Sequence, residues 1–292
     1  MESFNIILVN VNQYYGRKHV LKDVNLTIEK GMFGLLGRNG AGKTTLMKTL
    51  VTLLQRKSGE ATICGVELSN TAEVRTLVGY LPQDFTMYPN MTVKEALEYL
   101  GILSGLSKVA IDKKGSELLE MVNLTEHRHK KVKALSGGMK RRLGIAQALI
   151  HDPKVVIVDE PTAGLDPEER IRFRNLLSEI AKERIVLLST HIVGDIEATC
   201  EHIAILHEGR IVYDGLVAAL LQAVQRKVYQ ALIPSSRLEE LKSQYTVTSM
   251  LIQGADVLVR FISEQKPQFA AELVQPNMED AYMYYITKEH QS

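Results

Sequence analysis

The segment that most constrains the fold is the glycine-rich run at residues 37–45, Gly-Arg-Asn-Gly-Ala-Gly-Lys-Thr-Thr. It matches G-x-x-x-x-G-K-[ST], a pattern in which backbone N–H groups surround a bound phosphate. Lys43 supplies an ammonium group for the β- and γ-phosphates, and the Thr44 hydroxyl suits a hard cation such as Mg²⁺. An apolar run precedes the loop and a helical pattern follows it. This order predicts an α/β domain that holds a phosphate at a helix N-terminus.

The bulk properties of the chain indicate an ordinary globular protein. Its 292 residues suffice for about two domains. The net charge of +1 creates no general attraction for nucleic acid or an anionic membrane. Cys64 and Cys200 lie far apart, so we expect reduced thiols in a cytosolic protein rather than a disulfide or metal site. We also expect no signal peptide and no membrane helix, and therefore a soluble chain.

Two adjacent tyrosines lie between the first predicted strands, at residues 5–11 and 24–28. Tyr14 or Tyr15 can pack on a sheet edge, or it can offer a flat face to a base. Stacking of a base on an aromatic ring contributes about 1–3 kcal/mol where it has been tested. These residues alone favour neither interpretation.

Residues 84–150 have helical character and form a predicted insertion between strands of the α/β core. Thr92 and Glu95 form a capping box, and further helices are expected at 112–122 and after Ser136. The basic run at 127–133 contains no interleaved aromatic residues. A solvated loop is therefore favoured over a nucleic-acid site.

Two polar features beside this insertion are ambiguous by themselves. Gln83 follows an apolar strand-like run, where an amide most simply completes a turn. Ser136-Gly137-Gly138 opens a helix, and a hydroxyl with free N–H groups makes that end receptive to an anion. The cations that follow at residues 140–142 are disfavoured in a first helical turn. They are either tolerated at a solvated surface, or their repulsion is relieved when a phosphate binds.

Two buried strands end in residues that can do chemistry. Residues 155–158, after Lys154, form a continuous β-branched run that ends at Asp159 and Glu160. Asp159 can hold Mg²⁺ through water, and Glu160 can orient or deprotonate a water molecule, a role worth about 10²–10⁴ in rate. His191 ends a similar strand. A lone histidine is usually structural, but this sheet edge is where α/β domains bind ligands.

The C-terminal part shows no such chemistry. A hairpin around Glu208-Gly209 is followed by a predicted helix at 216–226 and two strands that turn near residues 254–256. A final helix is expected at about 278–287. We therefore predict a first domain at residues 1–215 and a small α+β appendage at residues 216–292.

Five motifs occur in an order that resembles the nucleotide-binding subunit of ATP-binding-cassette (ABC) transporters. They are GRNGAGKTT, Gln83 after LP, LSGGM, VVIVDEPTAGLD and His191 in STH. The resemblance covers residues 4–215. The resemblance implies an α/β fold: a P-loop NTPase core with an N-terminal antiparallel β subdomain and a helical insertion. Met139 departs from the family, which usually has glutamine at this position.

The resemblance also implies roles for individual residues. Tyr15 would stack on the adenine of ATP, and it is favoured over Tyr14 because it precedes Gly16. Glu160, His191 and Gln83 would serve catalysis. Thr44, Gln83 and Asp159 would serve Mg²⁺. The phosphates would contact Asn39, Gly40, Ala41, Gly42, Lys43, Thr44 and Thr45. Ser136 and Gly138 would close over ATP that is bound to a second subunit.

The implied partners are a transmembrane permease and a second ATP-binding subunit, identical or similar, with no nucleic acid expected. Such a subunit is cytoplasmic and peripheral on the inner face of the cell membrane. The tail at residues 276–282 resembles the ending of drug, antibiotic and polysaccharide exporters, which favours export. Phe85, Met87 and Tyr88 are candidates for contacting the permease, and a core position for them is equally compatible.

Two other classes of protein remain as alternatives. A soluble cassette ATPase that acts on ribosomes or DNA usually carries two cassettes or a long coiled coil, and this chain has neither. A P-loop small-molecule kinase leaves LSGGM and His191 unexplained.

Overall fold

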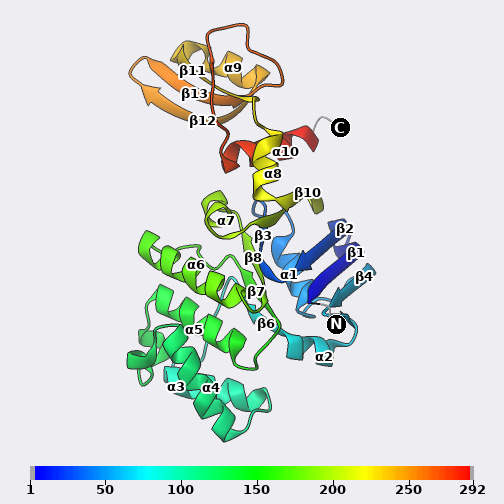
Figure 1. Ribbon diagram of the computed structural model, residues 1–292, viewed down its shortest axis with the longest axis vertical. Helices are drawn as coiled ribbons and strands as arrows, with labels where there is room; N and C mark the ends of the chain where they lie inside the picture. Colours follow the sequence, from blue (N-terminus) through cyan, green and yellow to red (C-terminus); the bar gives the residue numbers. More distant parts are fainter. Residues whose placement is uncertain (1–3, 290–292) are drawn as a thin grey trace. The chain divides into compact units, whose positions relative to one another are not determined.

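The computed structural model describes residues 4–289, which separate into two compact units (Figure 1). The first unit contains the chain up to Cys200 together with Leu206–Ile211. The second contains Glu201–Ile205 and the chain from Val212 onward. The division thus passes through the hairpin formed by β9 (His202–His207) and β10 (Arg210–Leu216). The domain boundary at residue 215 stays a prediction.

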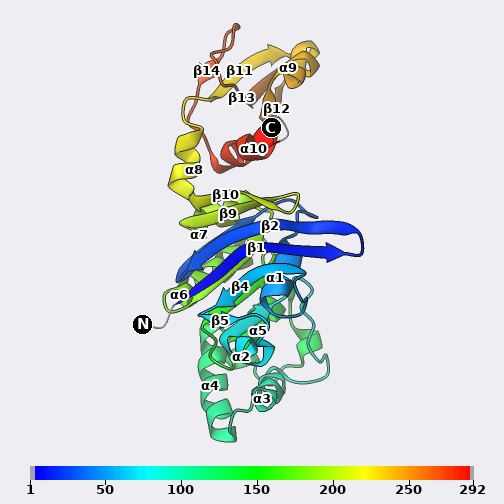
Figure 2. The same ribbon diagram turned by 90° about the vertical axis from the view of Figure 1, so that its right-hand side faces the viewer.

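An antiparallel sheet forms one layer of the first unit, in the order β2-β1-β4-β5 (Figure 2). Its strands are β1 (Asn5–Tyr15), β2 (Lys18–Glu29), β4 (Ser58–Ile63) and β5 (Val66–Glu67). β1 and β2 are longer than predicted and continue to a tight turn at Gly16. Alternate residues of β2 from Val24 to Ile28 are buried, so this sheet has one face packed on the core. The predicted N-terminal antiparallel subdomain is confirmed.

A parallel sheet carries the functional residues at one edge. Consecutive neighbours in it are β3 (Gly31–Leu36), β8 (Ile185–Thr190), β7 (Val155–Asp159) and β6 (Val78–Leu81). Every residue of β7 and β8 is buried, as expected for strands covered on both faces. The register places Leu36 beside Thr190 and Asp159 beside Ser189. The segments that follow these strands therefore leave the sheet at the same edge.

Helices surround this sheet and also form the predicted insertion. Beside the sheet are α1 (Lys43–Leu50), α2 (Thr71–Leu77), α6 (Pro167–Ala181) and α7 (Val193–Thr199). The insertion contains α3 (Val93–Leu103), α4 (Lys108–Met121) and α5 (Gly137–Leu149), with short turns at Thr125–His127 and Val132–Ala134. The capping box of Thr92 and Glu95 is confirmed. α4 begins four residues earlier than predicted, because the Ser107 side chain accepts a hydrogen bond from the Ala110 N–H.

The second unit is a small α+β fold, as predicted. Its four-stranded sheet has the order β12-β13-β11-β14. Its elements are α8 (Val217–Ala223), β11 (Val228–Pro234), a turn at Ser235–Arg237, α9 (Leu238–Gln244), β12 (Thr246–Gln253), β13 (Asp256–Ile262), β14 (Glu272–Leu273) and α10 (Met278–Glu289). The sequence did not reveal α9 or β14. Phe261 is fully buried among aromatic rings of this unit.

Within residues 4–289, none of the helices combines the length and apolar character that crossing a bilayer requires.

Candidate functional site

The loop between β3 and α1 has the geometry of an anion cradle. α1 begins at Lys43 without a side-chain cap and without an acidic residue in its first turn, so its N–H groups are left for a ligand. Gly40 has φ +83°, and a Cβ added there would meet nothing within 4 Å. Gly42 has φ +114°, and a Cβ there would come within 3.0 Å of the Leu21 side chain. One glycine leaves space for a ligand and the other permits close packing.

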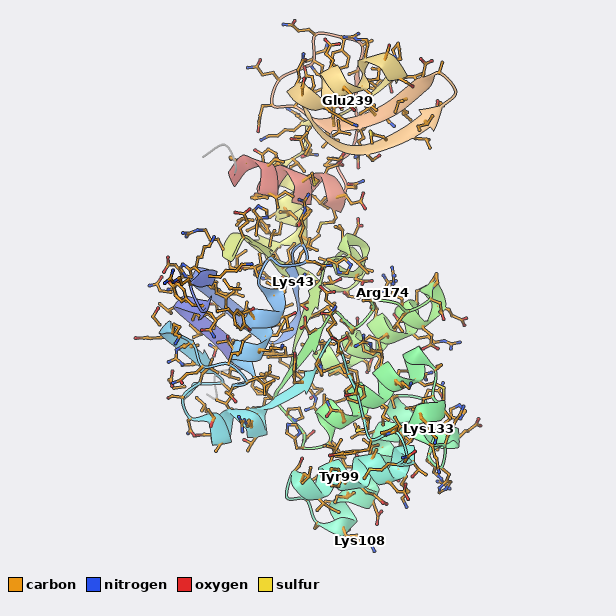
Figure 3. All side chains as sticks on the ribbon, turned by 180° about the vertical axis from the view of Figure 1, so that it is seen from behind. Lys43, Tyr99, Lys108, Lys133, Arg174 and Glu239 are labelled. Carbon is orange, nitrogen blue, oxygen red and sulfur yellow. The ribbon has the colours of Figure 1, made fainter. Side chains whose placement is uncertain are left out.

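Lys43, labelled in Figure 3, is the first residue of α1, and its side chain is buried. Its Nζ donates to the carbonyl oxygens of Gly37 at 2.7 Å and Arg38 at 3.2 Å. The same Nζ forms an ion pair with Glu160 Oε1 at 3.0 Å. The two side chains are only 4% and 6% exposed. A charge this deeply buried needs its partner, because either side chain alone would be left desolvated and unpaired.

Glu160 brings together the residues predicted for catalysis. Its Oε2 lies 3.1 Å from His191 Nδ1 and 3.5 Å from Gln83 Nε2, while Oε1 faces Lys43. Its backbone has φ +46°, in the left-handed region that costs a non-glycine residue about 1–3 kcal/mol. The N–H of Glu160 donates to the carbonyl oxygen of Ser189 at 3.1 Å, which holds this conformation in place.

Asp159 fits the requirements of a Mg²⁺ site. It is fully buried; Oδ1 accepts a hydrogen bond from the Ser189 hydroxyl, and Oδ2 has no hydrogen-bond partner. A buried carboxylate oxygen without a partner is costly unless a cation or water satisfies it. Within residues 4–289, no three His, Cys, Asp or Glu side chains converge as a metal-binding group. Mg²⁺ usually takes one or two carboxylates plus substrate phosphates and water, so a single carboxylate such as Asp159 fits its usual ligand set, and Thr44 and Gln83 stay predicted ligands.

The serine–glycine turn is a capped helix start. Ser136 is the N-cap of α5, and its Oγ accepts a hydrogen bond from the Met139 N–H at 3.2 Å. A Cβ at Gly137 would meet nothing within 4 Å, whereas one at Gly138 would collide with the Glu169 carboxylate. Lys43 contacts Gly37, Arg38 and Glu160, and none of these three residues belongs to the serine–glycine turn. The first turn of α5 is therefore shaped for close approach on the side of Gly137.

The two tyrosines differ in how their rings are placed. The hairpin register sets Tyr14 opposite His19, and the two rings stack at 4.1 Å with an interplanar angle of 9°. One face of Tyr14 is thus covered. Tyr15, at 49% exposure, is the more accessible ring for a base.

Comparison with known proteins identifies the family. A family model described as ABC transporter matches residues 21–163. The uncharacterized ABC transporter ATP-binding protein YxlF of Bacillus subtilis strain 168 is 41% identical over 216 residues, which cover 74% of this chain and 72% of YxlF. The chain belongs to the ABC transporter ATP-binding proteins. The expected family is confirmed.

Two further proteins are similar to this chain. The chain is 38% identical to a Nod factor export ATP-binding protein I of Burkholderia lata, over 73% of this chain and 71% of that protein. A solved bacterial ABC transporter cassette, MJ0796, described as dimeric, has a TM-score of 0.66 and 27% identity. That similarity covers 73% of this chain and 98% of MJ0796. The predicted ABC ATPase fold is confirmed.

The sequence alone did not reveal two residues that support the site of this cassette. Ser189 holds both members of the acidic pair, and its signal was a polar residue at the end of an apolar strand. Arg141 donates to the carbonyl oxygen of Pro82 at 3.2 Å, directly before Gln83. Burial lowers the pKa of the Arg141 guanidinium, which the nearby carboxylates of Asp84 and Asp159 oppose. This contact links the first turn of α5 to the Gln83 segment.

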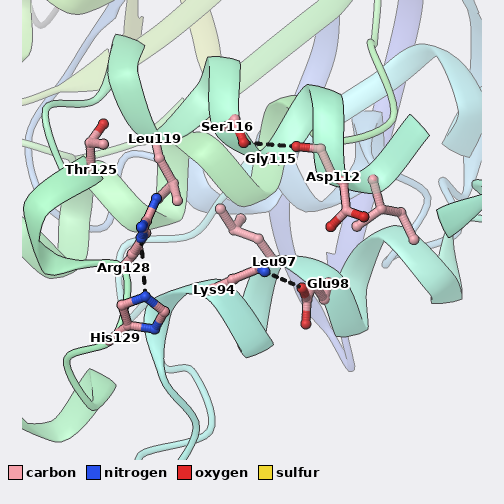
Figure 4. A pocket seen from close by; sticks show the side chains of 11 residues that line it. Lys94, Leu97, Glu98, Asp112, Gly115, Ser116, Leu119, Thr125, Arg128 and His129 are labelled. Carbon is pink, nitrogen blue, oxygen red and sulfur yellow. Dashed lines mark hydrogen bonds and ion pairs between the residues drawn. The ribbon is translucent and has the colours of Figure 1, made fainter. Parts of the chain in front are cut away.

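A separate cavity of about 250 Å³ lies in the helical insertion of the cassette (Figure 4). Leu97, Ile111 and Leu119 are its apolar lining, and charged side chains such as Lys94 and Glu98 stand around them. None of the residues predicted for ATP lines it. The nucleotide site and this cavity are therefore distinct features of the first unit.

Proposed function

We propose that this cassette hydrolyses ATP with Mg²⁺ and thereby energises a separate membrane permease, in an exporter. The observation that carries the proposal is the convergence of Lys43, His191 and Gln83 on the buried carboxylate of Glu160. A phosphate-binding lysine, an amide and an imidazole around one carboxylate match the requirements of phosphoryl transfer to water.

The ion pair between Lys43 and Glu160 suggests how ATP would start the reaction. The γ-phosphate would compete for Lys43 Nζ, which now contacts Glu160 Oε1 at 3.0 Å. Once released, the carboxylate could accept a proton from the attacking water, a role worth about 10²–10⁴ in rate. His191, which contacts the other oxygen of Glu160, would orient the carboxylate and approach the γ-phosphate. Mg²⁺, held by Thr44, Gln83 and Asp159, would neutralise charge on the phosphates.

The N-terminus of α5 supports a reaction between two cassettes. This end has no acidic residue in its first turn, Gly137 leaves open space, and the helix dipole favours an anion. We propose that Ser136 and Gly138 close over ATP held by the cradle of a second cassette, identical or similar. The dimeric description of MJ0796 is consistent with this arrangement. Tyr15 would stack on the adenine, together with backbone contacts from residues 39–45.

The permease contact is proposed for the segment after Gln83. Tyr88 is 52% exposed and packs edge-on against Tyr99 at 5.3 Å, so it offers a surface close to α3. Phe85 also approaches α5 at Gly144, which gives it a partly internal role. Export is favoured by the Nod factor export relative and by the tail at 276–282. The cassette would then lie on the inner face of the cell membrane through its permease.

Replacement of the central carboxylate tests the proposed catalysis. We expect Glu160→Gln to lower kcat by about 10²–10⁴ and to accumulate an ATP-bound dimer, because closure no longer ends in hydrolysis. Phosphate release and size-exclusion chromatography with Mg²⁺ and ATP measure the two effects. Glu168→Gln, a carboxylate at 75% exposure on α6, serves as the control. Normal hydrolysis by Glu160→Gln would show that another group acts as the base.

A further inference from the structure

Glu169 connects the start of α6 to the start of α5. It is the third residue of α6, and its N–H donates to Asp166 Oδ1 at 2.8 Å. Its carboxylate lies so close to Gly138 that a Cβ at that position would be 2.3 Å from Oε2 and 2.8 Å from Cδ. Side-chain Cβ atoms do not approach other atoms this closely. Glycine at position 138 is therefore what allows Glu169 to lie against the first turn of α5.

Arg142 extends this contact to a third helix. Its Nε lies 3.5 Å from Glu169 Oε2, and the two side chains are 11% and 18% exposed. Its Nη1 donates to the carbonyl oxygens of Val122 and Asn123, each at 3.0 Å, at the C-terminal end of α4. Among the described residues, Arg142 Nε has no hydrogen-bond partner, so the ion pair with Glu169 is what compensates the burial of this nitrogen. One carboxylate thus joins α6 to α5 directly and to α4 through Arg142.

The position of Glu169 in the chain gives this contact a role beyond stability. α6 follows the acidic pair after the turn at residues 161–166, while Ser136 and Gly138 begin α5. The negative carboxylate also lies where the dipole of α5 favours it. We infer that Glu169 is a positioning residue: it fixes the first turn of α5, and so the direction of Ser136 and Gly138, relative to the segment that carries Asp159 and Glu160. This inference rests on the proposed function, in which that turn binds ATP of a second cassette.

The neighbouring Glu168 provides a matched control. It lies in the same first turn of α6 and is 75% exposed, and it pairs at 2.6 Å with Arg172 of the same helix. Replacing Glu168 or Glu169 with alanine removes the same charge and the same length of side chain. Only the second change removes the contacts to Gly138 and Arg142.

Hydrogen exchange of the nucleotide-free chain tests the contact without requiring ATP binding. In Glu169→Ala we expect the amides of residues 137–142 to exchange at least about tenfold faster than in the wild type, because local opening of this turn becomes easier. Glu168→Ala should leave them unchanged. Equal exchange in Glu169→Ala and the wild type would overturn the inference.

A second test uses the space that Glu169 occupies. Alanine normally stabilises a helix relative to glycine. In the wild type Gly138→Ala should raise the melting temperature less than in Glu169→Ala, because the Glu169 carboxylate must first move away from the new Cβ. In Glu169→Ala the full gain is expected. An equal gain in both backgrounds would show that Glu169 does not lie against this turn in solution.

The dimer itself provides the functional readout, in the Glu160→Gln background with Mg²⁺ and ATP. We expect Glu169→Ala to raise the dimer dissociation constant about tenfold, within the range for coupled sites, while the nucleotide affinity of the monomer is unchanged. Glu169→Gln keeps the shape and should retain most of the affinity. Tighter dimers in Glu169→Gln would overturn the inference, since the carboxylate would then act by repelling phosphate. If the Glu160→Gln parent forms no dimer, the proposed function fails, while hydrogen exchange still decides the role of Glu169.

Discussion

Each unit of the molecule buries a carboxylate completely, and the two carboxylates differ in how fully their oxygens are hydrogen-bonded. Asp280, in the second unit, accepts hydrogen bonds from the Thr248 hydroxyl at 2.6 Å, from the Asn277 N–H at 2.8 Å, and from Nε and Nη2 of Arg260 at 2.6–3.0 Å. Asp159, in the first unit, accepts one from the Ser189 hydroxyl and leaves Oδ2 without a partner.

The difference separates a structural charge from one with a proposed functional role. Asp280 and Asn277 cap α10 reciprocally: each side chain accepts a hydrogen bond from the backbone N–H of the other. The ion pair between Asp280 and Arg260 also joins the start of this helix to β13. Asp159 is followed by a residue with a left-handed backbone and lies at a sheet edge. A buried carboxylate oxygen that accepts no hydrogen bond from the described residues, at the edge where α/β sheets bind ligands, is compatible with the proposed Mg²⁺ role of Asp159.

Removing Asp280 should have the largest effect on stability. We expect Asp280→Ala to lower the free energy of unfolding of the second unit by about 3–5 kcal/mol, because Arg260 is left with an unpaired, largely buried charge. ATP hydrolysis should be retained below the new transition temperature. Calorimetry measures the transition, and Glu279→Ala, an exposed carboxylate of the same helical turn, is the control. Equal stability of the two variants would contradict a structural role for Asp280.

For Asp159 we expect a loss of Mg²⁺ affinity without a loss of stability. Asp159→Asn should lower the apparent affinity for Mg²⁺ by about 10- to 100-fold, the usual effect of losing a group that holds a metal through water. The melting temperature should not fall, because the change removes a buried charge that lacks a partner on Oδ2. Titration of ATPase activity with Mg²⁺ measures the first effect, with Asp112→Asn on α4 as the control. A destabilised protein with normal Mg²⁺ dependence would make Asp159 structural, like Asp280.

The tyrosine pair allows a smaller test within the first unit. Tyr15→Ala should weaken ATP binding about tenfold, within the range for loss of one aromatic stacking partner. Tyr14→Ala should leave ATP affinity nearly unchanged, because the Tyr14 ring already stacks on His19. Equilibrium binding of ATP to each variant measures the difference. A larger loss for Tyr14 would reverse the assignment.

The smallest expected effect concerns pH. Burial lowers the pKa of the His151 imidazole below its ordinary value of 6.5, and the carbonyl oxygen of Val78, 3.2 Å from Nε2, only partly opposes this. Below about pH 6.5 the unfolded chain binds the proton more readily, so stability falls as pH decreases, by at most about 1.4 kcal/mol per pH unit. His151→Gln should lose less stability than the wild type between pH 7.5 and 5.5 in urea denaturation. If the free energy of unfolding of the two proteins changed equally with pH, His151 would not contribute to the pH dependence of stability.

The elements with strong local signals were the ones that the sequence predicted well. Glycines at 40 and 42, the apolar strand before Asp159, and the pair Thr92 and Glu95 each determine their structure through contacts within a few residues. The proximity of His191 to Glu160 also followed, since parallel strands that end level bring their following residues together.

Contacts between distant segments were not predictable in this way. Nothing in the sequence pairs Glu169 with Arg142, or Arg260 with Asp280, because such pairs depend on how helices and sheets pack. The stacking of Tyr14 on His19 likewise requires the register of a hairpin whose strands extend beyond their apolar residues. The Ser107 cap of α4 did have a local signal that was overlooked, as did Ser189 at the end of an apolar strand.

The contact between Lys43 and Glu160 has a consequence for anyone who changes either residue. Each side chain is the buried counter-charge of the other, so a substitution of one leaves the other desolvated and unpaired. Loss of turnover in a Lys43 or Glu160 variant would then combine a chemical effect with a folding effect. Melting temperatures recorded beside the rates would tell the two apart.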